Sequence, residues 1–147
     1  MMIEQDGAAV EDIRRIIEGR VRAVGEKDCD ALVAHHAPEV QTFDVLDPLR
    51  NEGPGAVRRR AEKWLSSYDG APGYEVRELS ITAGEAVAFC HYLYRVSGTL
   101  KTGGAVDMWV RATVCFGKVG GEWKIVHEHQ SVPFDARTGM ASLDLRP

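Results

Sequence analysis

Apolar residues repeat at intervals of three and four positions over the first part of the chain. Val10, Ile13, Ile17, Val21 and Val24 fall on one helical face, and charged residues occupy the opposite face. This pattern predicts an amphipathic helix of roughly four turns, which ends near Gly25.

Two further helices are expected before residue 73. The first begins at Asp28 or Asp30 as N-cap, presents Leu32, Val33 and His36, and is stopped by Pro38. The second begins at Pro54 and carries the apolar residues Val57, Ala61, Trp64 and Leu65 on one side. A strand over 40–44 lies between them, because this stretch is β-like and Asp47-Pro48 marks a turn after it.

The pattern changes to strands after residue 73. Glycine-rich turns separate four alternating segments, at 74–82, 87–100, 105–119 and 123–132. A helical first half followed by an antiparallel meander is an α+β arrangement, in which the helices pack on one face of the sheet. We therefore expect a single domain over residues 1–147.

Two turns set the expected register of the last three strands. If Gly120-Gly121 and Thr102-Gly103 are two-residue turns, His127 and His91 both lie opposite Val114. Alternate positions from 108 to 116 are apolar, so their face is the inner one. It would hold Phe89, His91, Leu93, Arg95, Met108, Val110, Ala112, Val114, Phe116, Ile125, His127, His129 and Ser131. One β-bulge would exchange the faces beyond it.

Composition narrows the class of protein. The 147 residues are 44% hydrophobic and carry 18 basic against 22 acidic residues, with no basic block, so nucleic acid is not an expected partner. Cys29, Cys90 and Cys115 lie among apolar neighbours in no metal-binding spacing, which indicates buried reduced thiols. The acidic N-terminus and the absence of a long apolar run predict a cytoplasmic protein without membrane contact.

Several inner-face residues are candidates for chemistry. His91, His127 and His129 would share one cavity, either as hydrogen-bonded core residues, as substrate contacts, or as metal ligands. Asp44 is a candidate general base, or alternatively caps a turn. Arg95 either binds a substrate carboxylate or pairs with Asp44 or Glu39.

Other side chains are assigned to walls and packing. Trp64, Met108 and Phe89 would form the wall of the same cavity, with Ser131 beside the histidines as a substrate contact. Trp123 begins the last strand on the inner side and is expected to pack against Ile13 and Ile17 of the first helix. Glu128 and Arg111 would form an ion pair on the outer face.

Several features resemble the SnoaL-like proteins of the NTF2-like superfamily. They are the order of helices and meander, the Phe43-Asp44 strand end, the Gly53 lead into the third helix, Trp109-x-Arg111-x-Thr113, and Gly-x-Trp-Lys-Ile-Val-His-Glu-His-x-Ser at 121–131. The last motif is also similar to the association domain of calcium/calmodulin-dependent kinase II. The resemblance implies an α+β cone open onto a pocket, usually dimeric through the sheet. Relatives include isomerases, cyclases, hydrolases and non-catalytic assembly domains.

The expected function is the binding of a small, partly apolar molecule. The resemblance to ketosteroid isomerases implies that Asp44 lies at or near the position of their general base, so proton abstraction next to a carbonyl is the enzymatic hypothesis, with His127 or His129 polarising the oxyanion and no cofactor or metal. The alternative is a non-catalytic binding or oligomerisation domain. Tyr92, Tyr94, Trp109 and Val126 would form an outer apolar surface, which predicts a homodimer.

Overall fold

The N-terminal helix forms as the apolar repeat predicts and extends further at its start. In the computed structural model, which describes residues 3–147, helix α1 spans Gly7–Glu26. The Asp6 carboxylate caps it by accepting a hydrogen bond from the Ala9 N–H at 3.1 Å. Met1 and Met2, the start of the acidic N-terminal segment, lie outside the described residues.

The other helices follow the expected order, but the first strand begins at His36 instead of residue 40, so that His36 and Pro38 belong to it, and the short strand Asn51–Glu52 was not predicted. Asp28 caps α2 by accepting a hydrogen bond from the Ala31 N–H. Pro54 lies in the first turn of α3, where its missing N–H costs nothing. The helices are α2 (Cys29–Val33) and α3 (Gly53–Ser66), and the strands are β1 (His36–Phe43), β2 (Asn51–Glu52), β3 (Gly73–Ala83), β4 (Val87–Thr99), β5 (Ala105–Val119) and β6 (Glu122–Ser131).

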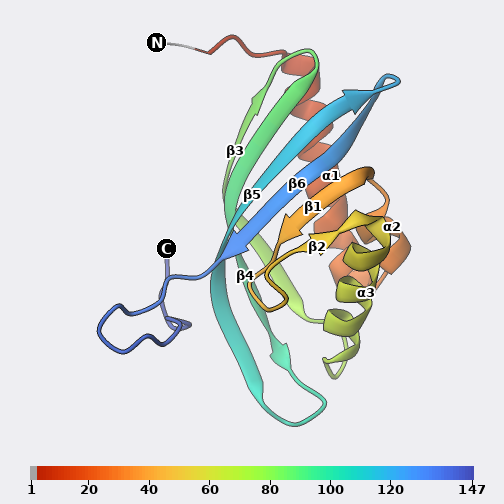
Figure 1. Ribbon diagram of the computed structural model, residues 1–147. Coiled ribbons are helices and arrows are strands. Elements are labelled where there is room, and N and C mark those ends of the chain that lie inside the picture. The colour runs from red at the N-terminus through yellow and green to blue at the C-terminus, as the bar shows by residue number, and fades with distance from the viewer. Residues whose placement is uncertain (1–2) are drawn as a thin grey trace.

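The six strands form one curved sheet in the order β2-β1-β6-β5-β4-β3. Strands β3 to β6 are the predicted meander, whereas β1 pairs with β6 in parallel. Figure 1 shows the helices on one side of this sheet and the C-terminal segment on the other side. We call the side that faces the helices the inner face. Helix α1 and the sheet share one apolar core, which includes Ile13, Ile17, Val114, Phe116, Trp123 and Ile125.

The register prediction for β4 was wrong by one residue. Leu100 donates its backbone N–H to the Gly104 carbonyl oxygen at 2.8 Å, so the loop holds three residues, 101–103, instead of two. His91 therefore lies opposite Thr113, and Cys90 lies opposite Val114. Because side chains alternate along a strand, this shift exchanges the two faces of the whole strand. Cys90, Tyr92 and Tyr94 are buried on the inner face.

The last strand changes faces at a β-bulge. Ile125 lies opposite Phe116 as predicted, but the next pair is His127 with Cys115, and Val126 has no partner in the β5 ladder. The strand thus gains one residue at Val126, and the faces are exchanged beyond it. Glu128 is buried on the inner face, whereas His129 is exposed. The strand carries Trp123 inside before the bulge and histidines outside after it.

Other expectations concern the thiols and the membrane. Cys29, Cys90 and Cys115 are free, but only Cys90 is buried, so the expectation of three buried thiols holds for one. Within residues 3–147, every helix is too short or too polar to cross a lipid bilayer.

Candidate functional site

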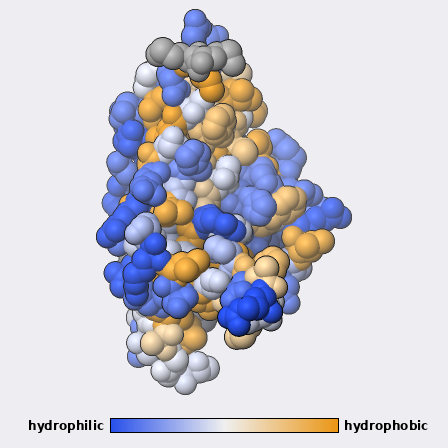
Figure 2. Space-filling view, turned by 90° about the vertical axis from the view of Figure 1, so that its left-hand side faces the viewer, coloured by the Kyte–Doolittle hydropathy of each residue, from blue (hydrophilic) through white to orange (hydrophobic). Residues whose placement is uncertain are grey.

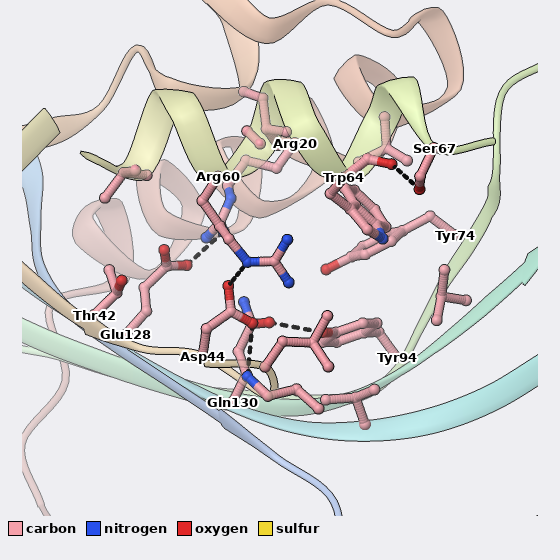
Figure 3. A pocket seen from close by; sticks show the side chains of 18 of the residues that line it. Arg20, Thr42, Asp44, Arg60, Trp64, Ser67, Tyr74, Tyr94, Glu128 and Gln130 are labelled. Atoms are coloured by element: carbon pink, nitrogen blue, oxygen red, sulfur yellow. Dashed lines mark hydrogen bonds and ion pairs between the residues drawn. The ribbon is translucent and has the colours of Figure 1, made fainter. Parts of the chain in front are cut away.

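A cavity of about 450 Å³ lies between the inner face of the sheet and helix α3 (Figure 3). Its apolar wall comes from α3, from β4 and β5, and from the loop between these strands: Val57, Trp64, Val96, Leu100, Val106 and Met108. Val57 and Trp64 share a face of α3 because they are seven residues apart. Pockets for small molecules typically measure about 300–1,000 Å³, so this cavity is large enough for a ligand.

Asp44 and Arg60 form an ion pair in the wall of the cavity. Asp44 follows β1, and its Oδ2 lies 3.0 Å from Arg60 Nε on α3. The Val45 N–H donates to Asp44 Oδ1 at 2.6 Å, which orients the carboxylate. The Nε–H of Arg60 is not aligned for a hydrogen bond, so charge attraction is the main link. Figure 3 shows the two terminal nitrogens of Arg60 directed across the cavity, on the side of Trp64 and Tyr74.

A second ionic group also lines the cavity. Glu128 of β6 contacts the Arg20 guanidinium of α1 and accepts a hydrogen bond from His36 Nε2 at 3.1 Å. Burial alone would raise the pKa of Glu128, but the charge of Arg20 and the bond to His36 outweigh it and lower the pKa to about 2. The same pairing outweighs burial at Arg20 and raises its pKa. Glu128 and Arg20 are therefore both charged at neutral pH.

Tyrosine hydroxyls supply neutral hydrogen-bonding groups. Tyr74 and Tyr94 line the cavity with stacked rings 4.8 Å apart, and Tyr92 is buried beside them. Burial raises the pKa of Tyr92 to about 12 and also raises the pKa of Tyr74 and Tyr94, so all three stay protonated. The Tyr94 hydroxyl donates to Gln130 Oε1 at 2.7 Å.

A comparison with known protein families shows to which family this chain belongs. The SnoaL-like domain matches residues 13–135. The chain belongs to the SnoaL-like domain family. The comparison with curated proteins found no match.

Solved structures confirm the NTF2-like fold. An NTF2-like protein of unknown function from Pseudomonas putida KT2440 is 30% identical, with a TM-score of 0.89 over 98% of this chain and 100% of that one. A ketosteroid isomerase-like protein from Erwinia carotovora atroseptica is 16% identical (TM-score 0.72, 86% and 97% covered). A protein named after the calcium/calmodulin-dependent protein kinase II association domain, from Xanthomonas campestris, is 17% identical (TM-score 0.70, 89% and 96% covered). The resemblance inferred from the sequence is confirmed.

Three of the predicted site residues lie at the cavity of this SnoaL-like protein. Asp44, Trp64 and Met108 all line it, from the end of β1, from α3 and from β5. Asp44 is paired with Arg60 instead of Arg95, and Trp64 lies one helical turn beyond Arg60. The predicted inner placement of β5, from Met108 to Phe116, is also confirmed.

The other predicted site residues lie on the outer face, because of the β4 register and the β6 bulge. Arg95 binds Asp107 through two hydrogen bonds of 2.8 Å, and Ser131 accepts a hydrogen bond from Arg111. The Nδ1 atom of His127 lies 2.6 Å from the Gln41 carbonyl oxygen. His91, His129 and Phe89 are exposed. The prediction that the three histidines project into the cavity was therefore wrong.

Within residues 3–147, no three His, Cys, Asp or Glu side chains are grouped so that they could hold a metal ion. His127 and His129 pack instead against the edge of the Phe43 ring, at centroid distances of 4.8 and 5.5 Å. Figure 2 shows the outer face, where apolar and polar side chains are interspersed.

The residues that sequence reasoning missed are Arg20, Arg60, Glu128 and the tyrosines. A signal for Arg20 was present, since it follows Ile13 and Ile17 at helical spacing on the buried face of α1. Arg60 similarly falls between Val57 and Trp64. A charged residue on an apolar helical face indicates a buried partner, which is Glu128 for Arg20 and Asp44 for Arg60.

Proposed function

We propose that this SnoaL-like protein binds a small, partly apolar molecule in the inner cavity and that Asp44 abstracts a proton next to a carbonyl group. The observation that supports this proposal is a carboxylate and a guanidinium side by side in the wall of a largely apolar cavity of about 450 Å³. Such a site can hold a hydrophobic body while it directs charged groups at one reacting position.

Each group has a separate task in the proposed step. Asp44 takes the proton from the carbon next to the carbonyl, and the electron pair of the broken C–H bond moves onto the carbonyl oxygen as an enolate. The terminal N–H groups of Arg60 and the Tyr74 hydroxyl donate hydrogen bonds to that oxygen. In a β,γ-unsaturated carbonyl substrate the charge of this enolate extends to the γ-carbon, and return of the proton from Asp44 to that carbon, with re-formation of the C=O bond, completes an isomerisation. In this proposal Arg60 and Tyr74 stabilise the oxyanion, in place of His127 and His129, for which the sequence predicted that role.

Hydrogen exchange on a simple ketone tests the proposal. We expect the protein to accelerate loss of the methyl proton signal of 2-acetylnaphthalene in D₂O, followed by NMR. Asp44→Asn should slow this exchange by about 10²- to 10⁴-fold, because the base is lost. Asp47→Asn, an exposed aspartate in the same loop, is the matched control and should exchange at the wild-type rate. Equal rates for wild type and Asp44→Asn would contradict a catalytic role for Asp44.

A non-catalytic binding function is the second candidate. One observation favours it: both oxygens of Asp44 already have partners, the Val45 N–H and Arg60. One of these contacts would have to give way before Asp44 could reach the C–H group of a substrate. Binding of 2-acetylnaphthalene without accelerated exchange would indicate this second function.

We further propose that the chain is a single domain and that two copies of it form a homodimer through the outer face of the sheet. Tyr92 and Tyr94 are buried on the inner face, which removes half of the predicted surface. Trp109 remains on the outer face under the Arg77 guanidinium, 5.0 Å from the ring centroid, and Phe89 is 43% exposed. Charges of both signs surround them, so two copies related by a two-fold axis can place opposite charges together.

Light scattering at micromolar concentration tests the dimer. We expect twice the chain mass for wild type and the chain mass for Trp109→Glu, because the substitution removes the large apolar ring of the proposed interface and adds a charge that association would have to desolvate. Leu49→Glu, at a residue that is 92% exposed in the β1–β2 loop, should remain dimeric. A wild type of monomer mass would rule out the dimer.

A further inference from the structure

The arginines and the carboxylates that line the cavity are equal in number. Arg20 and Arg60 carry two positive charges, and Asp44 and Glu128 carry two negative charges. Each arginine contacts one carboxylate, so the lining consists of two ion pairs. A ligand with a net charge would upset this balance in a partly buried, largely apolar site, where an uncompensated charge costs more than it does in water.

Some hydrogen-bond donors of the two arginines have no acceptor at the cavity in the part of the chain that the structure describes. Glu128 accepts from His36 and contacts one terminal nitrogen of Arg20, while the other terminal nitrogen, Nη1, is buried without a hydrogen-bond partner among the described residues. Arg20 itself is only 9% exposed. Arg60 contacts Asp44 through Nε, which leaves its terminal nitrogens directed into the cavity (Figure 3). Arg20 Nη1 is therefore a buried donor that needs an acceptor, and the terminal nitrogens of Arg60 are donors that face the cavity and are free to bind a ligand acceptor.

From these two observations we infer that the ligand is an uncharged molecule with an apolar body and at least one acceptor oxygen, such as a carbonyl. This inference rests on the proposed binding function and specifies its ligand class. The acceptor oxygen lies at the free N–H groups of Arg60, and the apolar body lies along Trp64, Val96 and Met108. Carboxylates of the same shape are disfavoured, because Asp44 already supplies the negative charge that Arg60 requires.

Three probes of nearly equal shape separate the contributions. They are 2-acetylnaphthalene with an acceptor, 2-ethylnaphthalene without one, and 2-naphthoate with a negative charge. We expect calorimetric titration at pH 7 to show the ketone binding at least about tenfold more tightly than each of the other two, since a hydrogen bond from a charged donor is worth that factor or more.

Variants at the Asp44–Arg60 pair should change this order in opposite directions. Asp44→Asn removes one negative charge, so 2-naphthoate should gain at least about tenfold in affinity. Arg60→Met retains the apolar stem but removes the donors, and the ketone should fall to the level of 2-ethylnaphthalene. Arg59→Met, at the exposed neighbour on the same helix, should leave all three affinities unchanged. If Arg60→Met alone unfolds, the double variant Asp44→Asn/Arg60→Met takes its place in this test, because it removes the same donors and keeps the cavity neutral.

The outcomes separate this inference from the proposed function. Equal affinity of the three probes, or tightest binding of 2-naphthoate to wild type, would overturn the inference and leave a binding cavity in place. An unchanged affinity of Asp44→Asn for 2-naphthoate would also overturn it. Failure of all three probes to bind at millimolar concentration would overturn the proposed binding function itself.

Discussion

Two carboxylates on opposite faces of the same sheet have the same pKa for different reasons. Asp107 on the outer face has a pKa of about 2 because Arg95 donates hydrogen bonds to it and adds its charge. The pKa of Glu128 on the inner face is also about 2, although burial alone would raise it, because the charge of Arg20 and the hydrogen bond from His36 outweigh the effect of burial. The outer pair is accessible to solvent, whereas the inner pair is enclosed. Equal pKa values therefore do not imply equal contributions to stability.

Removal of the two carboxylates should change the free energy of unfolding by very different amounts. Glu128→Ala should cost about 4 kcal/mol of unfolding free energy, because it leaves the Arg20 charge buried without its partner. Asp107→Ala should give a urea unfolding curve close to that of wild type, because its partner stays hydrated. Similar losses for both variants would show that the inner pair is not enclosed. The double variant Arg20→Met/Glu128→Leu should recover most of the lost stability.

The inner and outer faces should also differ in how much the removal of a tryptophan, in β6 or in β5, lowers the stability. Trp123 precedes the bulge and is only 5% exposed. Trp123→Ala should lower the free energy of unfolding by about 3 kcal/mol, because it leaves a cavity in the core. Trp109→Ala on the outer face should cost less than half of that in the monomer. Urea unfolding of the two variants measures the difference, and an equal loss would contradict the assignment of faces.

Acid should destabilise the protein in part through Glu128 on the inner face. The folded pKa of Glu128, about 2, lies below the unfolded value of 4.5, so the folded state binds fewer protons in this interval. The stability due to Glu128 is complete above about pH 5 and is lost as the pH falls towards 2. Glu128→Gln should flatten this part of the stability profile. An unchanged slope in the variant would exclude a contribution of Glu128 to the loss of stability in acid.

Salt should produce the smallest effect, and only on the outer face. At about 1 M NaCl the screening length falls to about 3 Å, which weakens exposed ion pairs. We expect the pKa of Asp107 to rise towards its usual value while that of Glu128 stays low. Carboxyl-carbon NMR titrations at low and high salt measure both groups in one sample. Equal shifts would indicate that solvent reaches both pairs.

The fold could be predicted because its signals are local. Glycine-rich turns and alternating residues gave strand limits within two residues of those observed from β3 to β6, and helix caps such as Asp28 were identifiable. The family motif at 121–131 pointed to the same fold. Each of these features depends on a few neighbouring residues, and all agree with one another.

The two faces of the sheet could not be predicted, because they depend on single-residue shifts. Strand β4 carries Phe89 and Leu93 on one side and Tyr92 and Tyr94 on the other, so its hydrophobic pattern does not select a register. The bulge at Val126 leaves no mark in the sequence alternation. For this reason Asp44, Trp64 and Met108, which lie outside both shifted segments, were placed correctly, whereas Glu128 and the histidines were not.

Methionine-methyl NMR tests the central claim that the inner cavity is the ligand site. Met108 lines the cavity, and Met140 lies in the C-terminal segment with 70% of its surface exposed, so the two methyl groups report on opposite faces. With ¹³C-labelled methionine methyl groups and 2-acetylnaphthalene, we predict nuclear Overhauser effects between the ligand and Met108, and none with Met140. Ligand contacts to Met140 with none to Met108 would contradict the claim.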